Sequence, residues 1–140
     1  MLRTAMWHDR LTAAAELAGR VLLGFLFIHE AWSKLAALDA AAAYMEAYGL
    51  PAQLLPFAIA LELGAGLLVA LGLLTRLAAL ALALFCVVAA VVFHSDFGDR
   101  GQAIHFLKDL ALAGAFLILA ARGAGAFSIE ALWSSRRRKN

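Results

Sequence analysis

The sequence predicts an all-α protein, specifically an integral membrane four-helix bundle with its N- and C-termini in the cytoplasm. Of the 140 residues, 64% are hydrophobic and only 16% are charged, whereas a soluble domain is nearer half apolar and a quarter charged. The apolar residues fall into four long runs, and a membrane-spanning helix needs about 20 of them. A chain of this length therefore has room for four spans joined by short loops and for no additional soluble domain.

The first half of the chain contains two of these spans. The first is expected over about residues 13–38, behind a cytoplasmic N-terminal arm of residues 1–12. A loop follows and contains Gly49 and Pro51. Because proline suits the first turn of a helix, the second span is expected over about residues 51–74.

The second half contains the other two spans, over about residues 76–94 and 102–121. In the third span only the thiol of Cys86 interrupts the apolar run. We interpret Cys86 as a small packing residue, with a reactive thiol as the alternative. Residues 123–140 are expected to form a basic cytoplasmic tail.

The basic residues are distributed unevenly between the two sides of the expected bundle. Nine of the 12 lysine and arginine residues fall on the side of the termini, and only Lys34, Arg100 and Lys108 fall on the other. The positive-inside rule therefore places both termini in the cytoplasm. The tail ends in four adjacent basic residues: Arg136, Arg137, Arg138 and Lys139. Because this cluster follows a hydrophobic helix, membrane lipids rather than nucleic acid are its expected partner.

Polar side chains within the spans gather in the outer half of the expected bundle. A charge in a span costs about 2.5–3.5 kcal/mol on insertion scales, so these groups should face the bundle interior and have partners. The candidate pocket or ligand-binding residues are Glu62, Lys34, His94, Lys108, Asp109, His105, Glu30, His29 and Arg20. On the first span, helical spacing also places five residues on one stripe: Arg20, Gly24, Phe27, Ala31 and Lys34.

Glu62 has two interpretations because it is expected near mid-bilayer. It is either a proton-carrying or ligand-binding carboxylate, or a structural partner in an ion pair with Arg20 or Lys34. Three histidines, His29, His94 and His105, are candidate metal or haem ligands. No HxxxH or ExxH spacing occurs, so such a site would have to be assembled across helices. Hydrogen-bonded or interfacial roles are the alternative.

The sequence contains none of the motifs of several enzyme classes. There is no GxGxxG, no P-loop and no GxSxG, which argues against nucleotide binding, phosphate binding and nucleophilic catalysis. No self-contained catalytic motif is present. If the chain takes part in catalysis, we expect it to act as a subunit of an oxidoreductase complex.

The chain resembles the DoxX family of small bacterial membrane proteins from Arg20 to Leu132. The residues that carry the resemblance are Arg20, Gly24, Phe27, Lys34, Tyr44, Gly49-Leu50-Pro51, Glu62-Leu63-Gly64, Leu71-Gly72-Leu73, Thr75-Arg76, Phe93-His94, Phe106-Leu107-Lys108, Gly123, Gly125 and Phe127-Ser128-Ile129-Glu130. Two positions depart from the family pattern. Ala31 stands where Gly is usual, and Asp109 stands where Asn is usual.

The resemblance implies a multi-pass protein of the bacterial cytoplasmic (inner) membrane. Relatives include a subunit linked to thiosulfate oxidation with a quinone as acceptor, and proteins implicated in oxidative-stress responses. The resemblance favours a subunit of a redox-linked membrane assembly. In this hypothesis an outer pocket for a quinone headgroup or for protons is lined by Glu62, Lys34, His94 and Lys108. A haem or metal is the weaker cofactor hypothesis. A small-solute or proton carrier or channel, and a non-catalytic scaffold, remain alternatives. Protein partner subunits or a homo-oligomer are expected in each case.

Overall fold

The computed structural model describes residues 2–137 and is all-α in this range, as the sequence predicts. In chain order the elements are α1 (Leu2–Ala36), α2 (Leu38–Ala47), the short 3-10 helix η1 (Ala52–Leu54), α3 (Leu55–Leu71), α4 (Thr75–Phe93), α5 (Arg100–Arg122) and α6 (Ile129–Arg137). Residue 1 of the expected arm, and Arg138, Lys139 and residue 140 of the expected tail, lie outside the described range.

Four segments of the described chain are long and apolar enough to cross a membrane. They are Trp7–Ala36, Ala52–Leu71, Thr75–Phe93 and Arg100–Arg122. Many large hydrophobic side chains on these helices point outward, including Leu22, Phe25 and Leu84, which are more than half exposed. A surface of this kind is costly in water and favourable in lipid. The four spans expected from the sequence are therefore present as helices.

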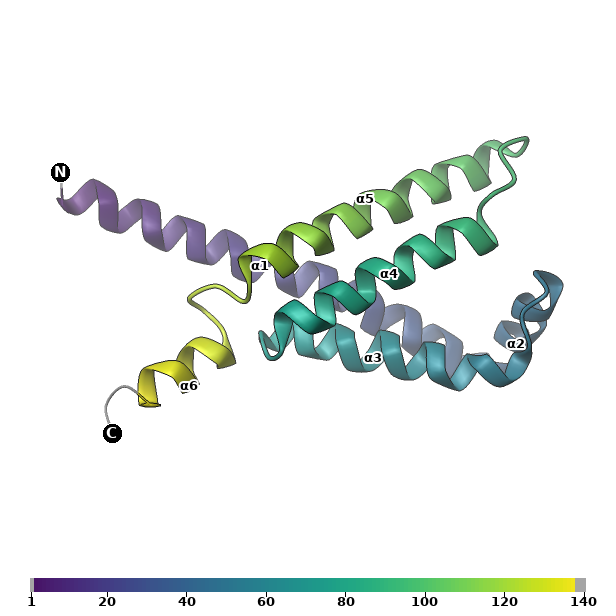
Figure 1. The fold of residues 1–140 in the computed structure, drawn as a ribbon, viewed down its shortest axis with the longest axis horizontal. Coiled ribbons are helices and arrows are strands. Elements are labelled where there is room, and N and C mark those ends of the chain that lie inside the picture. Colours follow the sequence, from purple (N-terminus) through teal and green to yellow (C-terminus); the bar gives the residue numbers. More distant parts are fainter. Residues whose placement is uncertain (1, 138–140) are drawn as a thin grey trace.

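The spans form two antiparallel hairpins, α1 with α3 and α4 with α5, which are joined by a tight turn between α3 and α4. Figure 1 shows that the hairpins cross and then diverge. Both termini, the α3–α4 turn and α6 lie at one end of the molecule, which we call the terminal end. The opposite end contains α2 and the α4–α5 loop, and we call it the loop end.

Two helices occur where the sequence analysis expected irregular chain. Residues 38–47 form α2, because this segment contains four consecutive alanines, which favour helix, and because Met45 is buried against the first hairpin. In the expected basic tail, α6 begins after Ser128, whose Oγ accepts a hydrogen bond from Ala131 N at 3.1 Å and so caps the helix. The first helix also begins earlier than expected, at Leu2.

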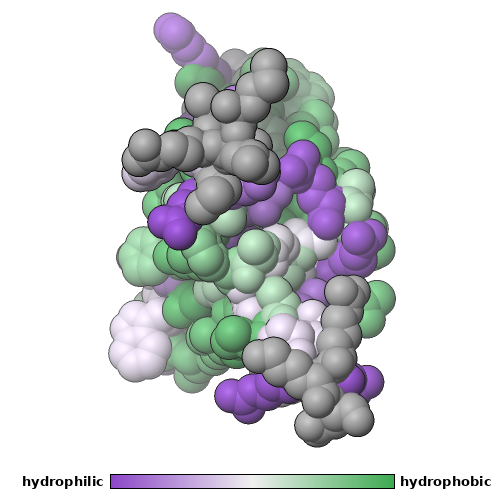
Figure 2. Space-filling model, turned by 90° about the vertical axis from the view of Figure 1, so that its left-hand side faces the viewer, coloured by the Kyte–Doolittle hydropathy of each residue, from purple (hydrophilic) through white to green (hydrophobic). Residues whose placement is uncertain are grey.

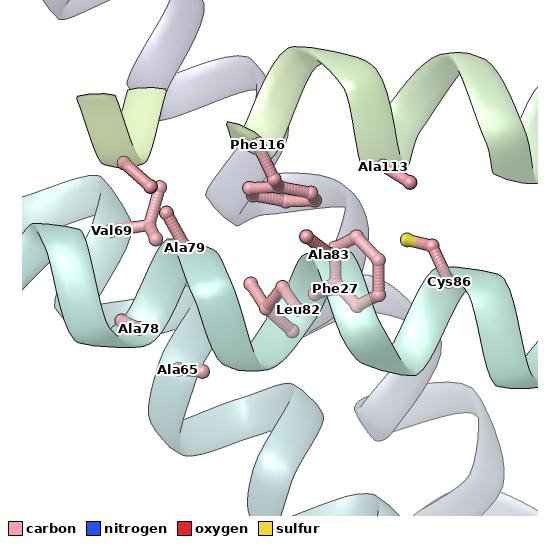
Figure 3. Close-up of a cluster of buried hydrophobic side chains, with 11 residues drawn as sticks. Phe27, Ala65, Val69, Ala78, Ala79, Leu82, Ala83, Cys86, Ala113 and Phe116 are labelled. Carbon is pink, nitrogen blue, oxygen red and sulfur yellow. The ribbon is translucent and has the colours of Figure 1, made fainter. Parts of the chain in front are cut away.

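The main hydrophobic core lies where the two hairpins cross. Phe27, Leu82 and Phe116 are almost completely buried there, and Figure 3 shows their side chains converging from α1, α4 and α5. The rings of Phe27 and Phe116 meet edge to face at a centroid distance of 5.4 Å. Cys86 is 2% exposed and belongs to this cluster, as expected for a packing residue.

The terminal end of the molecule carries a mixed surface. Figure 2, which looks onto this end, shows hydrophilic side chains among hydrophobic ones. Trp7 and Trp133 are 62% and 55% exposed. Tryptophan side chains of this kind are typical of the boundary between lipid and water.

The α1–α3 hairpin is held by an unusually close approach of the two backbones. A Cβ atom added to Gly24 would lie 2.5 Å from Gly66 O and 2.9 Å from Ala70 Cβ. Small residues allow such contacts, and in lipid, where the hydrophobic effect between helices is absent, this packing is a principal source of helix association. The hairpin therefore depends on the absence of side chains at Gly24 and Gly66.

We expect the substitution Gly24→Leu to separate α1 from α3 and to destabilise the protein by at least the 1–3 kcal/mol or so typical of an overpacked core. The matched control is Gly64→Leu, because a Cβ at Gly64 meets nothing within 4 Å. Thermal unfolding of both purified variants in the same detergent measures the difference. Equal melting temperatures for the two variants would contradict the proposed packing.

Candidate functional site

The first hairpin contains an ion pair in the middle of its second span. Lys34 Nζ donates to Glu62 Oε1 at 3.0 Å and lies 2.9 Å from Oε2. The Glu62 side chain is 3% exposed and that of Lys34 is 28% exposed. Glu30 Oε2, one helical turn before Lys34, lies 3.7 Å from the same ammonium. Of the two partners that the sequence analysis considered for Glu62, the structure selects Lys34.

The second hairpin contains a polar cluster centred on His94. Its Nδ1 lies 2.7 Å from Gln102 Oε1, so Nδ1 carries a proton and donates to the amide oxygen. Its Nε2 lies 3.8 Å from Asp109 Oδ2. The ring of His105 stacks on the His94 imidazole at a centroid distance of 5.1 Å. This cluster therefore combines a carboxylate with two imidazoles, groups that bind and release protons readily.

Helix α2 connects the two hairpins at the loop end. The ring of Tyr44 stacks on Phe93 of α4 at a centroid distance of 5.4 Å, and Tyr48 meets Phe93 edge to face at 5.3 Å. The hydroxyl of Tyr48 accepts a hydrogen bond from Gln102 Nε2 at 3.3 Å. Burial, together with the neighbouring Tyr48, raises the pKa of Tyr44 to about 12, so this phenol stays protonated at neutral pH.

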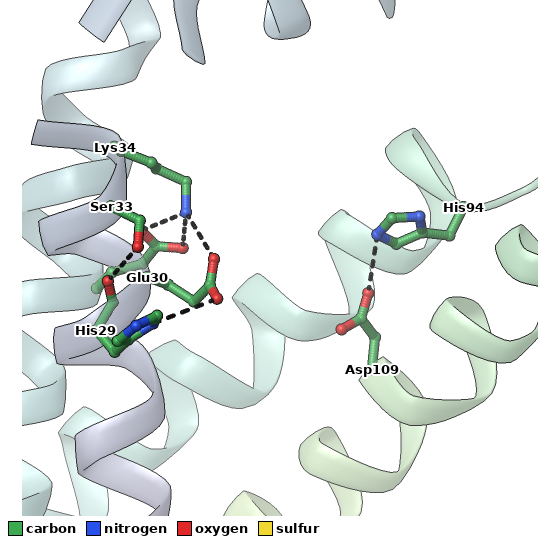
Figure 4. A network of polar contacts seen from close by, with 7 residues as sticks. His29, Glu30, Ser33, Lys34, His94 and Asp109 are labelled. Carbon is green, nitrogen blue, oxygen red and sulfur yellow. Dashed lines mark hydrogen bonds and ion pairs between the residues drawn. The ribbon is translucent and has the colours of Figure 1, made fainter. Parts of the chain in front are cut away.

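The two polar clusters therefore lie on different hairpins but in the same half of the bundle. Figure 4 shows Lys34 and His94 projecting from the two hairpins toward the region between them. Among the described residues, no hydrogen bond or ion pair joins the Lys34–Glu62 pair to His94 or Asp109. Toward the middle of the molecule, Phe27 and Phe85 from the two hairpins meet at 6.2 Å. The two clusters are thus separate groups of polar side chains in the same half of the bundle.

Arg20 was grouped with these candidates from the sequence, but the structure places it at the terminal end. Its Nη1 and Nη2 each donate to a backbone carbonyl, Ala124 O and Phe127 O, at 2.7 Å. The residue is 1% exposed. It lies fourteen residues before Lys34, or about 21 Å along a helix. Arg20 therefore fixes the loop between α5 and α6 and does not belong to the polar site.

The remaining candidates lie at the edge of the site. His29 is on the outer side of α1, with its side chain 60% exposed and its Nδ1 4.0 Å from Glu30 Oε1. Lys108 is exposed on α5, as is most of His105. In the described part of the chain, no group of three or more His, Cys, Asp or Glu residues is placed to hold a metal ion. The three candidate metal ligands are thus divided between α1 and the α4–α5 hairpin.

Two contributors to the site were not expected from the sequence. The side chain of Gln102 accepts a hydrogen bond from His94 and donates one to the Tyr48 hydroxyl. It therefore links the end of α2 with α4 and α5. A signal was available for Gln102, because Asp99 caps α5 by accepting from Gln102 N at 2.9 Å, and the short loop before it holds the start of α5 beside the end of α4. Tyr48 carried no such signal, because its role depends on the packing of α2.

Comparisons with known proteins agree with this architecture. The family model described as DoxX matches residues 15–95. The chain is 41% identical over 120 residues to the inner membrane protein YqjF of Escherichia coli K12, covering 86% of this chain and 92% of that protein. It is 32% identical over 121 residues to the inner membrane protein YphA of the same organism, covering 81% and 86% of the two chains. No solved structure gives a significant match.

These features define a small helical protein with four membrane-spanning helices and a polar cluster on each of its two hairpins. The chain belongs to the DoxX family. It is a multi-pass protein of the inner membrane. The resemblance identified from the sequence is confirmed.

We expect Lys34→Met to destabilise the protein more than Glu62→Gln does. The first substitution leaves a carboxylate that is 3% exposed without its cation, and breaking a buried pair in this way costs about 3 kcal/mol or more. The second leaves an ammonium that is partly exposed and still near Glu30. Thermal unfolding in detergent measures both effects, with His29→Gln as an exposed control. The opposite order would show that the carboxylate has another partner.

Proposed function

We propose that this protein is a subunit of a redox-linked membrane assembly that binds the headgroup of a quinone between its two hairpins, in the half of the bundle that contains Glu62 and His94. Reduction of a quinone to a quinol requires two electrons and two protons. In this proposal a partner subunit supplies the electrons, while the present chain holds the ring and delivers protons. The observation that supports this proposal most directly is the carboxylate of Glu62, which is almost fully buried in mid-span beside one partly exposed lysine, Lys34.

The chemistry of the two clusters suits a quinone. A quinone ring presents a carbonyl oxygen at each end. Lys34 on one hairpin can donate to one of them, and His94 on the other hairpin can donate to the second through Nε2 when its imidazole carries two protons. The contact of Phe27 with Phe85, nearer the middle of the molecule, is apolar and aromatic, and cofactor sites are typically apolar with a few placed polar groups. Glu62 and Asp109 lie next to Lys34 and His94, where each carboxylate can accept a proton and, once protonated, pass it on.

The quinone proposal is tested by analysing ligands that copurify with the protein. We expect protein extracted in mild detergent from quinone-containing membranes to retain quinone, detected by solvent extraction and chromatography. Glu62→Gln and His94→Gln should each lower the occupancy at least fivefold, whereas His29→Gln should not. The two substitutions lie on different hairpins, so that a loss of stability in one variant does not by itself account for a loss of quinone.

Several outcomes would contradict the proposal. Protein that is monodisperse, carries no quinone and does not bind added decylubiquinone would exclude it. Uptake of a small solute or protons by the protein alone in liposomes would favour a carrier instead. Retention of quinone by both variants would show that these polar groups do not bind the quinone and serve only as contacts between helices, as in a scaffold.

We also propose that the terminal end faces the cytoplasm, so that the quinone site lies in the outer half of the membrane. The support is the distribution of charge, since nine of the 12 basic residues of the chain belong to that side. Under this orientation residues 1–12 and 123–140 are the cytoplasmic arm and tail of a single transmembrane domain.

The orientation is tested with reporter fusions. A fluorescent protein that matures only in the cytoplasm, fused after Asn140, should be bright. Alkaline phosphatase, which is active only outside the cytoplasm, should be active when fused within the α4–α5 loop after Asp96 and inactive when fused after Arg76. The reverse pattern would invert the bundle and place the polar site in the inner half.

A further inference from the structure

A groove separate from the polar site runs between α1 and α5 at the terminal end. It has a volume of about 150 Å³, and its apolar walls are formed by Gly19 and Leu23 of α1 and by Ala115 and Ile118 of α5. A Cβ atom added to Gly19 would meet nothing within 4 Å, so the groove is open at this position. Leucine and isoleucine side chains line it toward the middle of the bundle, which makes its inner part apolar.

The rim of the groove at the terminal end carries an excess of basic side chains. The Arg122 side chain is 61% exposed, and it bonds to Glu16 Oε1 through Nη2 at 2.7 Å and through Nε at 3.3 Å. Arg76 reaches the same place, with Nη2 3.4 Å from Arg122 O. Three guanidinium groups, those of Arg20, Arg76 and Arg122, therefore lie at this end with two carboxylates, Glu16 and Glu130, which leaves an excess of one positive charge.

Arg20 provides a second and independent indication of a ligand. It lines the groove and is 1% exposed. Its two terminal nitrogens are occupied by loop carbonyls, but its Nε has no acceptor among the described residues. A buried charged donor without an acceptor is costly, and native proteins usually satisfy such a group with water or a ligand.

We propose that this groove binds an anionic phospholipid, with the phosphate at Arg122 and Arg76 and one acyl chain along Leu23 and Ile118. Guanidinium groups bind phosphate oxygens in a fixed two-pronged geometry. The order of groups along the groove matches such a lipid, because the charged rim lies at the end of the span and the apolar walls extend about 10 Å deeper, the length of α5 between Arg122 and Ala115. This site is independent of the quinone proposal.

The test compares two pairs of variants by native mass spectrometry of delipidated protein. The lipids added are phosphatidylglycerol and phosphatidylcholine with identical chains. For the wild-type protein we expect tighter binding of phosphatidylglycerol by at least tenfold. Gly19→Leu should remove this binding by filling the groove, whereas Gly64→Leu, at a second glycine with open space around it, should leave it intact.

The second pair separates loss of the ion pair from loss of the phosphate ligand. Arg122→Gln and Glu16→Gln both break the contact between these residues. Arg122→Gln should weaken phosphatidylglycerol binding at least tenfold, while Glu16→Gln should preserve or strengthen it. Equal binding of the two lipids by the wild-type protein would overturn the proposal, as would equal effects of the two substitutions. A change of oligomeric state on Gly19→Leu with unchanged lipid binding would also overturn it and would identify a second copy of the chain as the occupant.

Discussion

The face of α1 that carries Arg20, Gly24, Phe27, Ala31 and Lys34 is the constraint on which the rest of the molecule depends. Its middle is formed by Gly24, where α1 touches the backbone of α3 at Gly66. Because this contact sets the distance between the helices, it determines what the two ends of the same face meet. At one end Lys34 reaches Glu62, and at the other the guanidinium of Arg20 lies against Gly72, where a Cβ would collide with it.

The two ends of this face satisfy their charges in different ways. Arg20 forms no ion pair among the described residues and donates hydrogen bonds to two backbone carbonyls of the α5–α6 loop, with Glu130 and Glu16 near it. The loop is secured further by Glu130, whose Oε1 accepts from Thr75 N at 2.8 Å and whose N donates to Gly72 O at 3.1 Å. Lys34 is neutralised by a formal charge and remains partly exposed. The first arrangement holds the α5–α6 loop in place, whereas the second retains a partly exposed charged group.

Much of this organisation followed from the sequence because it depends on local periodicity. The four apolar runs gave the spans, and the spacing of Arg20, Gly24 and Lys34 placed them on one helix face. What failed depends on three-dimensional packing. Arg20 was assigned to the polar site because it is charged and shares the face of Lys34, although the length of α1 separates them. The alanines of α2 favour helix, but α2 was missed because its residues were assigned to the loop that ends at Gly49 and Pro51. The link from Tyr48 to Gln102 was missed with it.

The free-energy cost of burying the Lys34–Glu62 pair argues against a purely stabilising role for it. Replacing a buried ion pair by well-packed apolar residues is often neutral or stabilising, so such a pair is weak evidence for a stabilising role. Here α1 and α3 are already joined by the contact of Gly24 with Gly66, and the core between the hairpins is apolar. The packing of the bundle therefore does not require a carboxylate at mid-span. A second set of titratable groups, His94 and Asp109, lies on the other hairpin in the same half. Two clusters of costly groups in the same half of the bundle are what the proposed quinone site requires, and this supports the proposal over a purely stabilising role.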